Sequence, residues 1–400
     1  MTNISDTSVT RPQIHLLPGR SRRFRSGHPW IFSNEIVMSA EAKALPPGGL
    51  ATIVDAGGER LGVGTFNPHS LIAVRVLSRN PDETVDQSFL ALRLRRALAL
   101  RDRLYDRPFY RLIHAEADGL PGLVIDRYGD IVVLEANTAG MEMLLPALLA
   151  ALDEVLAPST VLLQNDGAIR KLEGLELYDR VAKGEISGPI ELEENGAYFF
   201  ADLVTGQKTG WFFDQRDNRA AVAAMAKGRS VIDFYSYAGG FAIQAALAGA
   251  GKVVAVDRSE GSLALAAQSA ERNGVVIEPV RAEAFAEMER LKAANQLFGV
   301  VIADPPAFVK SKKDLAAGSK GYRKMVRLAA GLVEPGGVLM VASCSHHMGT
   351  DAFAEEVRHG LSLAGREGRI LRSSGAGADH PLHPFLPESA YLKALLLQLD

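Results

Sequence analysis

Apolar and polar positions alternate most regularly after residue 205, where short apolar runs are each followed by an amphipathic stretch. This order of strands and helices is typical of a doubly wound α/β fold with a mostly parallel sheet. Strands are expected at 230–236, 252–259, 276–283, 298–306, 336–345, 367–374 and 391–399, and helices at 239–250, 260–273, 284–295, 321–333 and 350–364. Because no helix separates the last two runs, we expect the final strand to be reversed.

The part of the chain before residue 203 has a less regular pattern. Short β-like runs broken by Gly and Pro fill residues 13–85 and predict a small β-rich barrel or sheet domain. The three- and four-residue spacing of apolar positions predicts a helix at 86–104, and "DRYGD" between two apolar runs predicts a hairpin turn. A helix at about 140–156 and strands near 160–165 and 189–201 follow. We therefore divide the chain into a disordered tail (1–12), a β-rich domain (13–85), a middle α+β domain (86–202) and a doubly wound domain (203–400).

The composition is that of a globular chain, with 47% hydrophobic and 23% charged residues. No apolar run reaches the roughly 18 residues that a membrane span needs, and the first residues lack the pattern of a secretory signal. The single cysteine cannot form an internal disulfide, which fits a reducing compartment. We expect a cytoplasmic protein without a membrane partner.

The net charge of −3 conceals two basic segments near the start of the chain. Residues 1–80 hold nine Lys and Arg against five acids, and residues 93–111 hold seven Arg against two Asp. Local clusters matter to a polyanion because charges further away than about 8–10 Å are screened. The segment "GRSRRFRSGHPWIF" also places aromatic rings beside the arginines, a combination that can bind RNA phosphates and stack on bases. The candidate RNA contacts are Arg20, Arg22, Arg23 and Arg25.

Each basic feature has a second interpretation. A cluster of arginines can simply be the solvated face of a helix. Trp30 and Phe32, the aromatic residues of that segment, are more often core residues than base-stacking platforms.

The ends of the first three strands in the doubly wound domain carry residues suited to a nucleoside cofactor. Ligands bind at this edge of such sheets. The pair Gly239 and Gly240 would let the backbone approach a ligand, and Asp257 follows at the spacing of an acid that meets ribose hydroxyls. Glu283 could meet an adenine amino group, whereas Asp257 could instead cap a helix. The candidate set is Asp233, Tyr235, Gly239, Gly240, Phe241, Asp257, Arg258, Ser259 and Glu283, which does not exclude NAD.

Residues just before the first of these strands complete the candidate cofactor site. Gln215 and Arg216, together with Asn218, could close one side of the pocket. They could equally tie the preceding linker to the sheet.

The fourth strand ends in "ADPPAF", which separates the possible cofactors. Prolines lack an N–H group, so this loop is a poor phosphate binder. It could hold a planar base through the carboxylate of Asp304, the backbone of Pro305 and Pro306, and the ring of Phe308. A plain strand-ending turn is the alternative.

The fifth strand ends in "VASCSHHM", which contains the only cysteine of the chain, Cys344. A buried apolar residue, a metal ligand and a nucleophile are the three options. Cys344, His346 and His347 are too crowded to supply three ligands of a tetrahedral site, so no metal is expected. The two histidines receive no role.

Five motifs stand in order along the last domain: "TGWFFDQRDNR", "DFYSYAGGFA", "VVAVDRSEGSLALA", "DPPAFVKSK" and "SCSHHM". They resemble the RlmI-type 23S ribosomal RNA cytosine-5 methyltransferases, and "RSGHPWIF" and "AEADGLPGLVIDRYGD" resemble that family's earlier segments. The resemblance implies an N-terminal PUA domain, a middle domain of two β-hairpins around a helix, and a class I, Rossmann-like domain with a seven-stranded sheet. It also implies S-adenosylmethionine as cofactor. "RAEAF" departs from the family by one lost acid, and "HHM" replaces a "GLM"-like continuation.

The resemblance also implies the chemistry. It makes Cys344 the nucleophile that attacks carbon 6 of cytosine, and Asp304 the acid or donor at ring nitrogen 3. In the sheet order of the class these residues end neighbouring strands, about 4.8 Å apart. Ala307 and its neighbours offer no second cysteine for product release. The implied partner is 23S ribosomal RNA, free or in an assembling subunit.

Two other functions stay open from the sequence. One is methylation of a guanine or an exocyclic amine in RNA, and the other is a non-catalytic, RNA-binding ribosome-assembly factor. The oligomeric state is also open, with a homodimer among the options.

Overall fold

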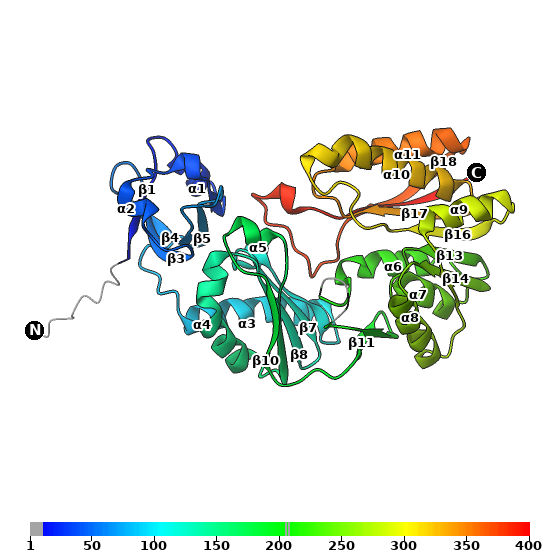
Figure 1. The fold of residues 1–400 in the computed structure, drawn as a ribbon, viewed down its shortest axis with the longest axis horizontal. Coiled ribbons are helices and arrows are strands. Elements are labelled where there is room, and N and C mark those ends of the chain that lie inside the picture. Colours follow the sequence, from blue (N-terminus) through cyan, green and yellow to red (C-terminus); the bar gives the residue numbers. More distant parts are fainter. Residues whose placement is uncertain (1–10, 205, 207–208) are drawn as a thin grey trace, which may run out of the picture. The chain divides into compact units, whose positions relative to one another are not determined.

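The structure is a computed structural model that describes residues 11–204, 206 and 209–400. Most of the expected tail (1–12) therefore lies outside the described residues. The chain forms two compact units: the first runs to Ser187 and includes Asp379–Pro387, and the second holds Gly188–Ala378 and Glu388–Asp400 (Figure 1). Among the described residues, no helix has the length and apolar character needed to cross a membrane.

The first unit begins with a five-stranded sheet in the order β1-β3-β4-β5-β2. Its strands are β1 (Gln13–His15), β2 (Trp30–Ile31), β3 (Gly49–Val54), β4 (Arg60–Phe66) and β5 (Val74–Ser78), with the short helices α1 (Ser21–Arg25) and α2 (Ala40–Lys43) between them. Ile14, Ile53 and Phe66 are among the buried residues of its core. The β-rich fold predicted for this part of the chain is confirmed.

A second five-stranded sheet, in the order β10-β9-β8-β7-β6, follows in the same unit. Its elements are α3 (Gln87–Leu104), β6 (Phe109–His114), β7 (Leu123–Tyr128), β8 (Ile131–Ala136), α4 (Ala139–Val155), β9 (Thr160–Asn165), α5 (Ile169–Leu172) and β10 (Tyr178–Lys183). Asp86 caps α3 by accepting a 3.0 Å hydrogen bond from the Phe89 N–H. The "DRYGD" turn joins β7 to β8, as predicted.

The segment Asp379–Pro387 packs into the first unit although it comes from the end of the chain. Asp379 and His380 are buried there. The Arg101 guanidinium donates to the Asp379 carbonyl at 2.9 Å and pairs with the Asp118 carboxylate at 2.6 and 2.8 Å. Burial beside cationic groups lowers the pKa of the neighbouring His114 to about 2, so this histidine is neutral. Nothing in the sequence pattern predicts this docking.

The second unit starts with the hairpin β11 (Ile190–Glu194) and β12 (Ala197–Ala201). Asn195 and Gly196 form its turn with φ of 52° and 75°, the left-handed region that suits these two residue types. The hairpin packs on α8 (Glu260–Arg272), whereas the sequence interpretation assigns it to the middle domain. The division into three domains at residues 85 and 202 stays a prediction.

The second unit is built on a seven-stranded sheet in the order β15-β14-β13-β16-β17-β19-β18. The strands are β13 (Ser230–Phe234), β14 (Lys252–Asp257), β15 (Glu278–Arg281), β16 (Phe298–Ala303), β17 (Val333–Ser343), β18 (Gly368–Ser374) and β19 (Lys393–Leu399). β19 is antiparallel to both of its neighbours, and the other neighbouring strands of the sheet are parallel. The doubly wound fold and the reversed last strand are both confirmed.

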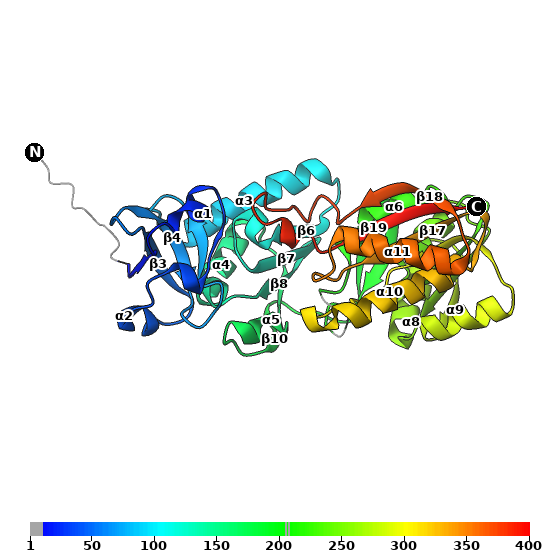
Figure 2. The same cartoon turned by 90° about the horizontal axis from the view of Figure 1, so that it is seen from above.

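Helices cover both faces of this sheet (Figure 2). α9 (Ala284–Ala293), α10 (Leu315–Ala330) and α11 (Thr350–Ala364) pack on one face, and α6 (Arg216–Ala223) and α7 (Gly240–Leu247) pack on the other. Several predicted boundaries are wrong by a few residues: β15 ends at Arg281, β16 ends at Ala303 and α10 begins at Leu315. A Cβ at Gly318 would meet the Val309 side chain at 2.4 Å, so this glycine allows close packing inside α10.

Candidate active site

Asp304 and Cys344 lie at the ends of two neighbouring parallel strands. Asp304 follows β16 directly and Cys344 follows β17 directly, with Ala303 paired to Val341 in the ladder. The Cys344 thiol donates to the Pro305 carbonyl oxygen, with 3.9 Å between sulfur and oxygen. Both residues are half-buried. The structure thus brings together the two residues that the sequence singles out for chemistry.

Ser345 joins the loops that carry these two residues. Its buried hydroxyl oxygen lies 3.1 Å from the Val309 N–H, which donates to it, and 2.9 Å from the Tyr322 hydroxyl. The Ser345 N–H in turn donates to the Ser343 hydroxyl at 3.3 Å. These bonds fix the loop after β16 to the loop after β17. The sequence analysis gives Ser345 no role, and only its place in the "SCS" motif could have indicated one.

Lys393, the first residue of β19, is buried beside the same loop. Its ammonium donates to the Ser345 carbonyl at 2.6 Å and to the Tyr391 carbonyl at 2.7 Å. Burial lowers the pKa of Lys393 to about 8, while the nearby charge of Cys344 acts in the opposite direction. The sequence analysis missed this residue, whose signal is a lysine at the start of the apolar run "ALLLQL".

Gln215 contacts Asp304. Its side-chain amide donates to a carboxylate oxygen of Asp304 at 2.8 Å. The Asn218 amide donates to the Gln215 carbonyl oxygen at 2.6 Å, and the Ser374 hydroxyl donates to the Asn218 carbonyl oxygen at 2.7 Å. Arg216, its neighbour, lies against the buried Glu194, 3.7 Å away. Of these two candidate cofactor residues, Gln215 is the one that contacts the candidate catalytic residue Asp304.

The loop after β13 has an unusual backbone. Tyr235 and Tyr237 have φ of 62° and 49°, a left-handed conformation that costs energy in residues other than glycine. Gly239, at the start of α7, has φ of 81°, and a Cβ on Gly240 would meet the Arg219 Nε at 2.5 Å. Such strain is concentrated at ligand-binding turns.

Four buried polar atoms at the end of β13 and in the loop after it have no well-aligned hydrogen-bond partner among the described residues. They are the two carboxylate oxygens of Asp233, the Tyr235 hydroxyl and the Ser236 hydroxyl. Burial raises the pKa of Asp233 to about 8 and raises that of Tyr235, and Asp304 adds to the effect on Asp233. Unsatisfied buried polar groups are costly, so they suit a polar ligand that carries positive charge. The methionine part and sulfonium of S-adenosylmethionine fit this donor and acceptor set.

Asp257 ends β14 next to the same loop. Its carboxylate accepts from the Tyr237 N–H at 2.9 Å and from the Ser259 N–H at 2.8 Å. The helix cap of α8 is Ser259, whose hydroxyl accepts from the Ser262 N–H at 3.2 Å. Asp257 is therefore no helix cap, and its oxygens keep lone pairs for ribose hydroxyls. Arg258 and Glu283 are exposed, and Glu283 stands at the start of α9.

Two aromatic candidates pack mainly against protein. The Phe308 ring lies 4.7 Å from the Tyr322 ring and 6.0 Å from the Phe285 ring, between centroids. Phe241 is buried in the core under the sheet. Pro305 is buried and Pro306 is exposed. A base at this loop would therefore meet Pro306 and the exposed part of Phe308.

The two histidines after Cys344 are exposed. His346 stacks on Tyr391 with 5.3 Å between ring centroids, and the Tyr391 hydroxyl donates to the Asp214 carboxylate at 2.6 Å. Within the described ranges, no group of three His, Cys, Asp or Glu side chains is arranged to hold a metal.

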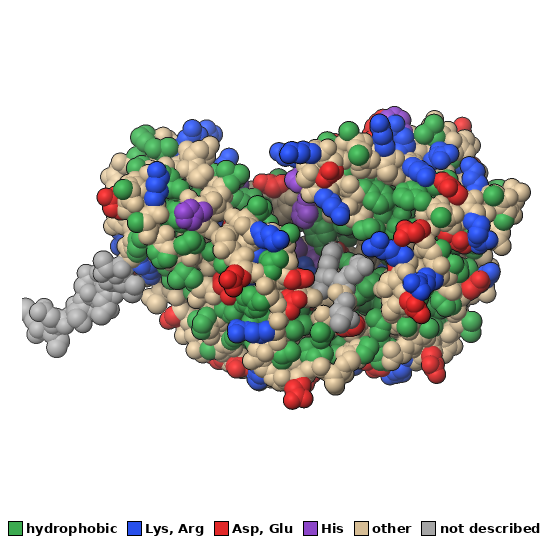
Figure 3. Space-filling model, in the orientation of Figure 1, with side chains coloured by type: hydrophobic (Ala, Val, Ile, Leu, Met, Phe, Trp, Pro, Cys, Tyr) green, Lys and Arg blue, Asp and Glu red, His purple; other side chains and the backbone are tan. Residues whose placement is uncertain are grey.

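The predicted basic segments are only partly available to RNA. Arg25 pairs with Glu59 and Asp55, and the Arg23 guanidinium lies 4.9 Å from the Phe32 ring centre. Arg20 and Arg22 are exposed and make no side-chain hydrogen bond or ion pair within the described part of the chain. Figure 3 shows basic side chains at the surface over α1. This segment keeps an exposed positive charge.

Three arginines of the second basic segment, at 93–111, are paired with acids. Arg101 and Arg111 pair with Asp118 and Asp126, and Arg95 pairs with Glu154. Arg96, Arg103 and Arg107 are exposed, so the use of this segment in RNA binding stays a prediction.

Trp30 is half-buried, and its indole N–H donates to the Glu116 carboxylate at 2.7 Å. This polar tie fixes the ring and favours the structural interpretation of Trp30.

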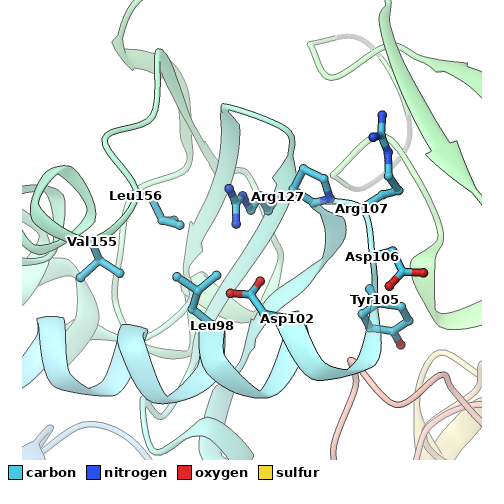
Figure 4. Close-up of a pocket in the computed structure, with 9 residues that line it drawn as sticks. Leu98, Asp102, Tyr105, Asp106, Arg107, Arg127, Val155 and Leu156 are labelled. Atoms are coloured by element: carbon cyan, nitrogen blue, oxygen red, sulfur yellow. The ribbon is translucent and has the colours of Figure 1, made fainter.

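A surface pocket of about 310 Å³ lies elsewhere, in the first unit, near the end of α3 (Figure 4). Leu98 and Asp102 of α3 line it together with Arg127 of β7 and Val155 of α4. It contains none of the candidate cofactor or catalytic residues.

Comparisons with known proteins agree with both parts of the fold. Residues 14–79 match the family model of a PUA-like domain, and residues 179–398 match that of an S-adenosylmethionine-dependent methyltransferase. Ribosomal RNA large subunit methyltransferase I of Cronobacter sakazakii is 37% identical over 388 residues, 95% of this chain and 98% of that protein. The protein of the same name from Photobacterium profundum is 38% identical over 387 residues, 95% and 97% of the two chains.

Solved structures share the fold. A putative S-adenosylmethionine-dependent methyltransferase from Streptococcus mutans has a TM-score of 0.81 at 19% identity, covering 97% of this chain and 100% of its own. A putative methyltransferase solved in complex with SAH has a TM-score of 0.82 with the same identity and coverage.

Proposed function

This chain belongs to the ribosomal RNA large subunit methyltransferase I family, and we propose that it methylates carbon 5 of a cytosine in 23S ribosomal RNA. Its cofactor is S-adenosylmethionine. The observation that carries the choice of cytosine carbon 5 is the placement of Cys344 and Asp304 at adjacent strand ends, with the thiol 3.9 Å from the Pro305 carbonyl. A thiol and a carboxyl on one side of a planar ring are what this reaction requires.

The two residues divide the chemistry between them. The Cys344 thiolate adds to carbon 6 of the ring, and Asp304 holds a proton at nitrogen 3, so carbon 5 becomes nucleophilic. S-Adenosylmethionine, when bound, supplies the electrophilic methyl group. After carbon 5 is methylated, it loses its proton to a base, the carbon 6–sulfur bond breaks and Cys344 returns as the thiolate. The base is not assigned to a residue.

The unsatisfied polar groups at the loop after β13 would hold the cofactor. Asp233, Tyr235 and Ser236 supply acceptors and hydroxyls, and Asp257 supplies carboxylate lone pairs for the ribose. Glu283 would meet the adenine.

The first unit would bind the RNA. Its PUA-like region carries the exposed Arg20 and Arg22, which suit phosphate contacts. The substrate is proposed to be 23S ribosomal RNA, free or in an assembling subunit. A cytoplasmic location follows from such a substrate.

A covalent trap tests the mechanism. In ribosomal RNA that contains 5-fluorocytidine, carbon 5 carries fluorine in place of the proton that the base removes. Because the fluorine cannot be removed in this way, the enzyme and RNA should remain joined through Cys344. We expect a denaturation-resistant adduct with the unaltered protein and none with Cys344→Ala. Normal methylation by Cys344→Ala, or no adduct with the unaltered protein, would overturn the mechanism.

The treated RNA and the purified protein also distinguish the proposed function from the two alternatives. Mass spectrometry of digested RNA distinguishes 5-methylcytosine from a methylated guanine or exocyclic amine. Failure to bind S-adenosylmethionine in calorimetry would indicate a non-catalytic assembly factor.

A further inference from the structure

Lys393 is a buried ammonium whose described partners are two backbone carbonyls and no carboxylate. The residue is only 4% exposed. The carbonyls of Ser345 and Tyr391 accept its two hydrogen bonds, at 2.6 and 2.7 Å. Burial of a charge without a counter-ion costs free energy, so a lysine buried in this way is expected to have a functional role.

Lys393 lies next to the loop that carries Cys344. Lys393 is paired with Ser343 across the antiparallel strands β17 and β19, and its ammonium contacts the backbone of Ser345. It therefore contacts the residues on both sides of Cys344. The positive charge of the Lys393 ammonium also interacts favourably with the negative charge of the thiolate form of Cys344.

We propose that Lys393 is a positioning residue which holds the Cys344 loop through the Ser345 carbonyl and stabilises the thiolate form of Cys344 by its positive charge. Its value for catalysis rests on the proposed function, because only a nucleophilic Cys344 needs to be a thiolate. The effect of the Lys393 charge on the Cys344 thiolate does not require bound RNA or cofactor.

Other titratable groups among the described residues also lie near the Cys344 thiol. Tyr322 of α10 lies close enough to interact with Cys344 electrostatically. Asp304 follows the neighbouring strand β16, and His346 lies on the same loop as the thiol. A negative Asp304 disfavours the thiolate, so a cation is needed to offset it.

The single cysteine makes a direct test possible. The rate of alkylation by iodoacetamide, measured across pH in the protein without RNA or cofactor, reports the thiolate fraction of Cys344 alone. Lys393→Met should raise the midpoint of that profile by about 1 to 2 pH units, which lowers the rate at pH 7 about 10-fold or more. Lys393→Arg should keep a profile close to that of the unaltered protein.

Lys252→Met is the matched control, because Lys252 is an exposed lysine of the same unit. It should leave the midpoint unchanged. An unchanged midpoint in folded Lys393→Met would overturn the proposal.

The unaltered protein provides a second test in case Lys393→Met does not fold. Its alkylation midpoint should lie below the ordinary thiol pKa of about 8.5, and a midpoint at or above that value would also overturn the proposal. Neither measurement uses RNA. A failed RNA adduct with a low midpoint would therefore reject the proposed function and leave the role of Lys393 in the free protein intact.

Discussion

The Gln215 amide donates a 2.8 Å hydrogen bond to the Asp304 carboxylate. The carbonyl side of the same amide accepts from Asn218, which is itself held by Ser374 of β18. An amide that is fixed at both ends presents its N–H group in one orientation. The proposed acid is thus oriented by a chain of three side chains that reaches the edge of the sheet.

Gln215→Leu should lower kcat about 10- to 100-fold, because a hydrogen bond to a charged group is worth about 1.5–3 kcal/mol. The Kd for S-adenosylmethionine should change by less, since Gln215 contacts Asp304. Steady-state kinetics and calorimetry separate the two effects. Gln268→Leu, on the exposed side of α8, is the control and should change neither. A large loss of cofactor affinity with unchanged kcat would instead place Gln215 at the cofactor.

Ser345→Ala should destabilise the protein and slow the reaction. The substitution leaves the Val309 N–H without its acceptor and removes one partner of the Tyr322 hydroxyl. Loss of such buried bonds costs about 1–3 kcal/mol. Urea unfolding measures the stability, and the rate of adduct formation with 5-fluorocytidine RNA measures the activity. Ser362→Ala, at an exposed position of α11, should have no effect on either. Equal stability of the two variants would show that Ser345 does not hold the loops together.

Asp233 should make the cofactor-free protein less stable as pH rises. Its pKa is raised from the ordinary 3.8 to about 8. Between these values the unfolded chain releases the proton while the folded chain keeps it, so the free energy of unfolding falls from about pH 4 to pH 8. Asp233→Asn removes this slope and should stabilise the cofactor-free protein at pH 8 by about 1–3 kcal/mol.

The comparison that isolates Asp233 is the difference in stability between pH 5 and pH 8. It should be smaller in Asp233→Asn than in the unaltered protein, and unchanged in Asp351→Asn, an exposed position. Asp233→Asn should also weaken binding of S-adenosylmethionine. Tight binding by this variant would remove Asp233 from the cofactor site.

The sequence predicts the parts of the site that depend on chain order. Strand periods locate β16 and β17 to within about three residues. The sheet order that the family resemblance implies makes these strands neighbours, so Asp304 and Cys344 could be placed together at one edge. Lys393 could not be found in this way. Its relation to Ser345 depends on the antiparallel pairing of β17 with β19, and a lysine in an apolar run does not reveal its partner.

Charge counts along the chain were a poorer guide. The segment 93–111 is basic by composition, but Asp118 and Asp126 neutralise two of its arginines after folding. Asp379 also reaches Arg101 from the other end of the sequence. Local composition cannot show such long-range pairs, so it does not reveal which arginines of the segment stay exposed.

RNA binding can be tested by comparing N-terminal arginines that pair with acids with those that do not. Arg20 and Arg22 are exposed, whereas Arg25 already pairs with Glu59 and Asp55. Each phosphate contact releases counterions, so loss of one contact reduces the salt slope of binding by about 0.7 to 1.

Replacing both Arg20 and Arg22 with alanine should weaken RNA binding about 10-fold at moderate salt and reduce the slope by about 1 to 2. Arg25→Ala should have a smaller effect on both, because its charge is already balanced. Filter binding at several salt concentrations measures affinity and slope together. If Arg25→Ala reduces the slope as much as the double variant, the ion pairs of Arg25 open on binding and α1 as a whole contacts the RNA. If neither variant changes the slope, the RNA is held by another surface, and the basic segment serves only the stability of the first sheet.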